Sequence, residues 1–174
     1  MPNWCENDLR VIGKKEEIQR FLDHVKTESS RFDFETIIPY PDEFKKLDET
    51  AAAWEKNKDK PPNAMRPKDG FNSGGYEWCI NNWGTKWNLV EGDYCKIDFD
   101  EMEQWGDECT LELHFDTAWS PPVPVIHEAS NLFPELTFEL RYFEQGCAFN
   151  GIYRVQNKKV ELDKTGEYFG NRGG

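Results

Sequence analysis

Hydrophobic and polar residues alternate with a period of two near the start of the chain. In residues 5–12 the odd-numbered positions share one face and the even-numbered positions share the other, which predicts a strand that Gly13 ends. Apolar residues then recur at helical spacing in residues 14–26, which predicts an amphipathic helix. Residues 32–38 are apolar and are followed by two prolines, so they predict a second strand.

The same order of elements returns in the second half of the chain. Residues 109–119 alternate strictly and predict a strand, and Ser120 with two following prolines is typical of a capped helix start. Residues 136–143 alternate again, and residues 148–162 predict a hairpin that turns at 157–158. Two strand–helix–strand units indicate an α+β fold, a ferredoxin-like split βαβ sandwich with an antiparallel sheet.

A long segment separates the two units. We predict one domain over residues 1–174, with a helical and loop insertion between the halves at about 42–92 and extra C-terminal strands at about 147–174. Within the insertion, residues 42–56 predict a helix and residues 76–83 a second one that stops at Gly84, where a left-handed backbone is needed. Residues 94–99 predict a further strand.

Composition narrows the classes of partner. The net charge of −12 and the pI near 4.7 argue against direct binding of nucleic acid and against an anionic membrane surface. No apolar run has the length of a membrane span, and the first residues do not form a signal peptide. Five cysteines are an odd number, so we expect reduced thiols and a cytoplasmic protein of a bacterial host cell.

The negative charge is concentrated in one span. Residues 97–140 contain no lysine or arginine, whereas the loop at 57–72 is a local basic island that opposite charge would draw toward residues 98–108. The acidic span is either a solvated face that aids solubility or a surface for a basic partner. The acidic-face candidates are Asp98, Asp100, Glu101, Glu103, Asp107, Glu108 and Glu112.

Aromatic residues are concentrated in residues 74–88, which hold three of the seven tryptophans. Aromatic side chains at this density either fill a core or form a recognition surface, and the sequence leaves both readings open. If they form a cleft, polar residues at the ends of the neighbouring elements would line it. The candidates are Asn82, Trp83, Lys86, Trp87, Asn88, Asp116, Trp119, Glu144 and Cys147.

No motif assigns a reaction or a cofactor. The three histidines are far apart, and the chain has no CxxC pair, no HxxxH pair and no phosphate-binding glycine loop. A Cys147–His114 pair has no local feature in its support. Carboxylates are too abundant for a pair to indicate catalysis, and Asp116 and Glu144, at the ends of two paired strands, would be the choice among them. We therefore assign no catalytic residue, metal or cofactor, and we expect a protein that is not an enzyme.

Four motifs resemble one known family. The segments WCINNWGTKWN, FDTAWSPP and FPELTFELRYFEQGCAFNG, with the opening MPNWCENDLRVIG, are similar to the YubB ferredoxin-like family of bacteriophages and plasmids. The similarity covers most of the chain outside residues 56–72. It implies a ferredoxin-like α+β fold and a mobile-element, cytoplasmic setting, and it implies no activity.

Two functions remain at this stage. The first is a non-enzymatic acidic binding protein of a phage or plasmid, which engages a basic host protein of a defence or nucleic-acid-handling system through its acidic face. The alternative is a small-molecule binder or enzyme that uses a tryptophan-lined cleft for a nucleotide-like ligand.

Overall fold

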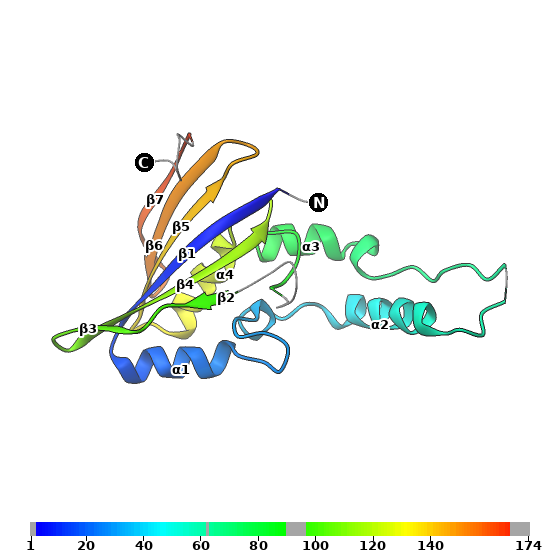
Figure 1. Cartoon of the computed structure of the whole chain (residues 1–174), viewed down its shortest axis with the longest axis horizontal. Helices are drawn as coiled ribbons and strands as arrows, with labels where there is room; N and C mark the ends of the chain where they lie inside the picture. The colour runs from blue at the N-terminus through cyan, green and yellow to red at the C-terminus, as the bar shows by residue number, and fades with distance from the viewer. Residues whose placement is uncertain (1–2, 62, 90–96, 168–174) are drawn as a thin grey trace.

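A single antiparallel sheet organises the molecule (Figure 1). The computed structural model describes residues 3–61, 63–89 and 97–167. Within these ranges seven strands form the sheet in the order β2-β4-β1-β5-β6-β7, with β3 paired to β4. The strands are β1 (Trp4–Gly13), β2 (Ile97–Phe99), β3 (Glu103–Trp105), β4 (Glu108–Ala118), β5 (Thr137–Glu144), β6 (Phe149–Gln156) and β7 (Lys159–Glu167).

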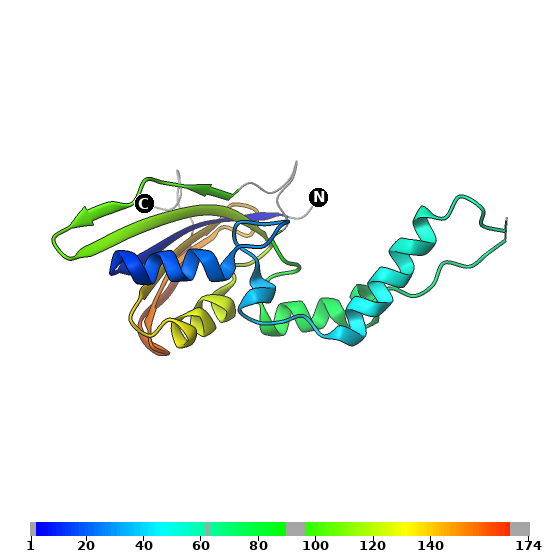
Figure 2. The same cartoon turned by 90° about the horizontal axis from the view of Figure 1, so that it is seen from below.

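Two helices cover one face of this sheet, as Figure 2 shows. They are α1 (Lys15–Val25), which follows β1, and α4 (Val123–Leu132), which connects β4 to β5. The four strands β2-β4-β1-β5 and these two helices have the order and direction of a ferredoxin-like split βαβ sandwich. The predicted fold class is therefore confirmed, and β6 and β7 are the expected extra C-terminal strands.

The core lies between the sheet and the two helices. Alternation places Leu9 and Val11 of β1 and the apolar positions of β4 and β5 on the covered face, where they are buried. Phe21 of α1 makes edge-to-face contacts with Phe32 and Phe138. Aromatic side chains such as these are large, so each of them buries a large apolar area in the core.

The strand predicted at residues 32–38 is wrong. The segment forms a short 3₁₀ helix, η1 (Phe34–Thr36), whose first turn is capped because the Asp33 side chain accepts a hydrogen bond from the Glu35 backbone N–H. Phe32 and Phe34 are fully buried, so burial explains the apolar composition without strand pairing. The edge position next to β4 is taken by β2, which comes after the insertion.

The helix start after β4 also differs from its prediction. Ser120 does not cap α4, since the helix begins at Val123 after Pro122 and the Ser120 hydroxyl donates to the Gly84 carbonyl over 2.6 Å. The predicted hairpin turn is confirmed, because Asn157 and Lys158 both have positive φ values between β6 and β7. Of the strand predicted at residues 94–99, β2 accounts for 97–99, and the remainder lies outside the described residues.

The insertion extends away from the sheet as an arm (Figures 1 and 2). It contains α2 (Asp42–Lys56), a second 3₁₀ turn, η2 (Phe71–Ser73), and α3 (Gly75–Asn82). Two of its basic side chains are engaged inside the arm: Arg66 pairs with Glu55 and Asp69, and the Lys60 ammonium lies 4.1 Å from the Trp54 ring centre. The loop is remote from the β3–β4 hairpin in both views, so the expected contact with residues 98–108 is not made.

The opposite face of the sheet has no helix over it in the described ranges (Figure 2). We call it the open face. In the same ranges, no helix combines the length and the apolar composition that a bilayer crossing requires. The open-face side chains of the strands are therefore not covered by any helix of the described ranges.

Candidate functional site: the open sheet face

The strand registers align the open-face side chains into rows that cross the sheet. One row reads Glu112 (β4), Arg10 (β1), Glu139 (β5) and Arg154 (β6), because these residues are direct cross-strand partners. Negative and positive charges alternate along it. Opposite charges at directly opposed positions stabilise a sheet, so this row contributes to the pairing of β4, β1, β5 and β6.

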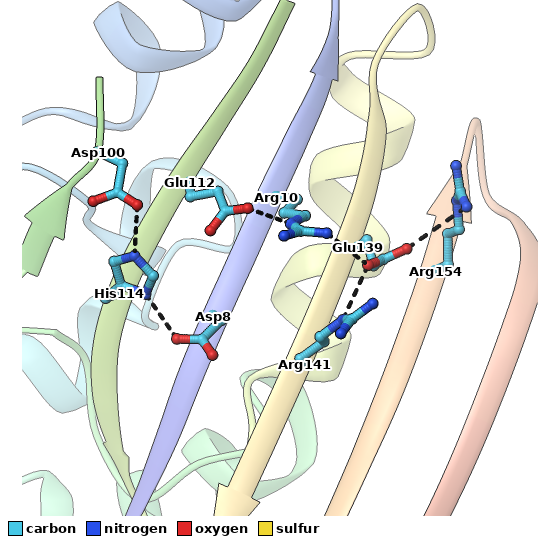
Figure 3. A network of polar contacts seen from close by, with 8 residues as sticks. All are labelled: Asp8, Arg10, Asp100, Glu112, His114, Glu139, Arg141 and Arg154. Carbon is cyan, nitrogen blue, oxygen red and sulfur yellow. Dashed lines mark hydrogen bonds and ion pairs between the residues drawn. The ribbon is translucent and has the colours of Figure 1, made fainter. Parts of the chain in front are cut away.

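Glu139 is the centre of this charged row (Figure 3). Its residue is 7% exposed, and its carboxylate lies 3.2 Å from the Arg141 Nε, 3.6 Å from an Arg154 nitrogen and 4.0 Å from an Arg10 nitrogen. Arg10 also makes a short ion pair with Glu112. A buried carboxylate is costly unless its charge is compensated, and three guanidinium groups provide that compensation.

His114 is the centre of the neighbouring row. Its Nδ1 lies 2.7 Å from an Asp8 oxygen on β1, and its Nε2 lies 3.2 Å from an Asp100 oxygen beyond β2 (Figure 3). Partial burial lowers the pKa of His114, but the hydrogen bonds to Asp8 and Asp100 outweigh that effect and raise the pKa overall. Protonated His114 thus links β1 and β4 to the segment after β2.

Replacing His114 with glutamine should therefore destabilise the protein in a pH-dependent way. Because the folded-state pKa is raised, the stabilisation is fully present below the unfolded-state value of about 6.5 and disappears as the pH rises through the folded-state value. The imidazole is partly exposed, so we expect at most about 1 kcal/mol of difference. Urea unfolding at acid and alkaline pH measures it, with His24→Gln as control. A difference that grows toward alkaline pH would contradict the assignment.

Three side chains of this region have metal-ligand chemistry. One ligand atom each of Asp100, Glu112 and His114 lies within 4.8 Å of the others. Each group already has a polar partner, because Arg10 binds Glu112 while Asp8 and Asp100 bind the two nitrogens of His114. The arrangement satisfies itself as a hydrogen-bond network, and we assign no metal to it.

Carboxylates dominate the open face over β1, β2 and β4. A hollow of about 390 Å³ there is lined by Glu6, Asp8, Asp98, His114 and Asp116, among other residues. Among the described residues, Arg10 and His114 are the basic side chains at the open-face positions of these strands. We define the acidic half of the open face by its six carboxylates: Glu6, Asp8, Asp98, Asp100, Glu112 and Asp116.

The acidic-face candidates are thus divided between two places. Asp98, Asp100 and Glu112 belong to the acidic half, whereas the other candidates lie in or beside the β3–β4 hairpin and are exposed: Glu101, Glu103, Asp107 and Glu108. Sequence reasoning missed Glu6 and Asp8, which complete the acidic half from β1. The signal was available, because both occupy the polar positions of the alternating strand at residues 5–12.

Several candidates for a tryptophan-lined cleft are structural. Trp83 is 2% exposed, and its indole N–H donates to the Ile38 carbonyl over 2.9 Å. The Asn88 side chain accepts from the Phe34 backbone N–H and donates to Asp33, so it fixes η1. Asn82 donates to the carbonyl of Trp78 in its own helix. These contacts support the reading in which this part of the segment belongs to the core.

Three other candidates do meet at the surface. The Lys86 ammonium lies 4.8 Å from the Trp87 ring centre and 4.5 Å from the Trp119 ring centre. Trp87 and Trp119 are 36% and 42% exposed. Trp119 has a φ of 74°, a left-handed conformation that is uncommon for a bulky residue and occurs often at functional sites. We call Lys86, Trp87 and Trp119 the tryptophan cluster.

The remaining candidates lie in the β5–β6 turn or on the open face. Glu144 is 1% exposed and accepts hydrogen bonds from the backbone N–H groups of Gly146 and Cys147, so it shapes the turn. Cys147 is exposed, and Asp116 belongs to the acidic half. Burial raises the pKa of the Cys5 thiol to about 12, so that thiol is not a nucleophile at neutral pH.

Known proteins share this architecture. The family model described as "Ferredoxin-like domain in Api92-like protein" matches residues 82–169. The crystal structure of protein Api92 from Yersinia pseudotuberculosis aligns over 98% of this chain and 99% of that one, with a TM-score of 0.55 and 11% identity, which shows a common fold. No curated protein matches the chain. The expectation of a ferredoxin-like family is confirmed at this level: the chain belongs to the family of Api92-like proteins with a ferredoxin-like domain.

Proposed function

We propose that this protein is a non-enzymatic binding protein whose acidic half engages a basic partner. The observation that carries the proposal is the arrangement of six carboxylates on one uncovered sheet face, five of them on the adjacent strands β1, β2 and β4 and the sixth, Asp100, directly after β2. A sheet displays its side chains on a regular lattice with about 4.8 Å between strands, so these charges act together on one docked segment.

Electrostatics supports this choice of partner. The acidic half adds to a net charge of −12, so the field around the open face attracts cations and repels nucleic acid and anionic lipid. At physiological salt the Debye length is about 8 Å, and a lysine-rich or arginine-rich segment must therefore approach closely to gain from the field. A basic protein segment meets that requirement.

The resemblance to the YubB family supports a biological setting for this function. In our proposal the protein acts in the cytoplasm of a bacterial host, on behalf of a phage or plasmid. The partner would be a basic host protein of a defence or nucleic-acid-handling system, because proteins of that kind carry the clustered lysine and arginine that the acidic half requires.

Neutralising the acidic half should weaken binding of a basic probe. We expect the triple variant Asp98→Asn, Asp100→Asn, Asp116→Asn to bind a short lysine-rich peptide about tenfold more weakly than the wild type. The estimate assumes about 0.5 kcal/mol for each exposed charge. Fluorescence anisotropy with a labelled peptide measures the dissociation constant, at about 50 and 300 mM salt to vary the screening.

A matched control has the same net charge. The triple variant Glu16→Gln, Glu28→Gln, Glu49→Gln also removes three exposed carboxylates, but these lie on α1, on the loop after it and on α2. We expect it to bind within about twofold of the wild type, a difference of less than 0.5 kcal/mol. Equal losses in the two triple variants would show that overall charge, and not the open face, governs binding.

The tryptophan cluster supports a second candidate function. Two exposed indoles around an ammonium group, next to a strained backbone, are suited to holding a small ligand with a planar ring. This is the small-molecule, nucleotide-like alternative, and Trp119→Ala is the variant that tests it. Saturable nucleotide binding that disappears in Trp119→Ala would favour it over the first candidate.

A further inference from the structure

The open face continues from the acidic half into the tryptophan cluster. The start of β1 lies beside the end of β4 (Figure 1), and alternation places Trp4 on the open face, in line with Glu6 and Asp8 of the same strand. The Trp4 and Trp87 rings pack edge to face, with 6.4 Å between their centres. Trp4 therefore joins the two surfaces, and one docked segment can contact both.

The tryptophan cluster has the composition of an anchoring surface. Trp87 and Trp119 are exposed, and Tyr76 extends the cluster, because its ring centre lies 6.3 Å from that of Trp119 and 6.0 Å from the Lys86 ammonium. Neighbouring aromatic rings at a protein surface are typical of interaction sites, and tryptophan and tyrosine are enriched among the residues that contribute most to binding. The cluster is therefore suited to holding one large side chain of a partner.

Lys86 restricts which side chain can dock there. Its ammonium group lies among the rings, so it repels a lysine or an arginine of the partner and leaves those residues to the acidic half. The surrounding rings offer apolar surface, and the ammonium group can interact with the face of a further ring. An aromatic side chain fits both conditions, whereas a purely basic segment does not.

The strand geometry sets the spacing between the two kinds of partner residue. Trp4, Glu6 and Asp8 follow one another at two-residue steps, which are about 7 Å each in an antiparallel strand. Asp116 lies directly across from Glu6, and Asp98 lies in the row of Asp8. An extended peptide along β1 points every second side chain toward the sheet at the same interval. Its aromatic residue and its basic residues thus fall two and four positions apart.

We propose that the basic partner binds through an extended segment with one aromatic residue and with lysine or arginine two and four positions from it. The aromatic ring packs against Trp4, Trp87 and Trp119, and the basic side chains lie over the acidic half. The inference rests on the proposed function and deepens it, because it states the sequence pattern of the partner. It also assigns the tryptophan cluster to that partner and not to a separate small molecule.

Three labelled peptides of equal length and charge test the proposal on the full chain. The first has phenylalanine with lysine two and four positions after it, the second has alanine in place of phenylalanine, and the third has the lysines moved to one and three positions after phenylalanine. In fluorescence anisotropy the first should bind at least about fivefold more tightly than either of the others, since it alone matches both surfaces on one face.

Protein variants locate the aromatic residue. In Trp87→Ala and in Trp119→Gly, the preference for the first peptide over the alanine peptide should fall below about twofold. Glycine adopts the positive φ of residue 119 readily, so the second variant removes the ring without adding backbone strain. Trp105→Ala is the matched control, because Trp105 is exposed on β3, and it should retain the full preference.

The outcomes separate this inference from the proposed function. Equal binding of all three peptides would overturn the inference and leave the proposed function in place. Absence of binding for all three, with far-ultraviolet circular dichroism showing a folded chain, would overturn both. A preference for the first peptide that persists in Trp87→Ala and Trp119→Gly would overturn the assignment of the aromatic residue to the tryptophan cluster.

Discussion

Replacing Trp83 with alanine is expected to lower the free energy of unfolding by about 3–5 kcal/mol, the range for large-to-small changes of buried aromatic residues. The Trp83 ring is 2% exposed and contacts Phe34, Tyr40 and Trp78. The change also leaves the Ile38 carbonyl without its indole donor. Chemical denaturation measures the loss.

Trp105 offers a control for this measurement. Its residue is 77% exposed on β3, so Trp105→Ala should change the stability by less than about 0.5 kcal/mol, as surface substitutions usually do. Trp83 connects η1 with α3, and the expected loss therefore reflects how firmly the insertion is attached to the sheet domain. A loss below about 1 kcal/mol for Trp83→Ala would show that the ring is not part of the core.

Replacing Gly84 with alanine should have the second-largest effect. Gly84 has a φ of 79°, and a Cβ atom there would lie 2.6 Å from Pro124 Cδ and 3.0 Å from the Pro121 carbonyl. Left-handed strain of about 1 kcal/mol and overpacking of about 1–3 kcal/mol together give an expected loss of about 2–4 kcal/mol. Thermal or urea unfolding of the purified variant measures it.

A second glycine, Gly106, allows the backbone strain to be measured without the overpacking. Its φ is 65°, yet a Cβ atom there would have no neighbour within 4 Å. Gly106→Ala should therefore cost only the conformational strain, about 1 kcal/mol. If both alanine variants lose the same stability, the close approach of α4 to Gly84 does not contribute.

Alternation predicted the sheet because each central strand has one covered and one uncovered face. The period of two in residues 5–12, 109–119 and 136–143 identifies β1, β4 and β5, and it also separates core positions from open-face positions. The hairpin between β6 and β7 was predictable for a similar reason, since Asn157 is a residue type that accepts a positive φ.

Residues 32–38 show where this reasoning fails. An apolar run of that length is compatible with a buried strand and with any other buried segment, and periodicity does not separate them. Here the Asp33 cap and the bond from the Phe34 N–H to Asn88 decide for a 3₁₀ turn. Asn88 is 54 residues away in the sequence, so no local pattern contains this information.

Sequence reasoning predicted only part of the candidate site, because contacts between residues that are distant in the sequence leave no local pattern. The acidic candidates on β4 and β2 were recognised as a charge-rich span, but the partners Glu6 and Asp8 come from the other end of the chain. Lys86, Trp87 and Trp119 were recognised as aromatic and polar element ends, and they do meet. Glu144 and Trp83 have the same residue types, yet burial gives them structural roles.

The most direct test of the central claim is to map where a basic segment binds. Titration of ¹⁵N-labelled protein with a lysine-rich peptide should shift the backbone amide signals of open-face residues on β1, β2 and β4, such as Glu6, Asp98 and Asp116, and the shifts should diminish with salt. The signals of α1 and α4, on the covered side, should stay in place. Shifts centred on the helices or on the β3–β4 hairpin, with the acidic half unaffected, would contradict the account.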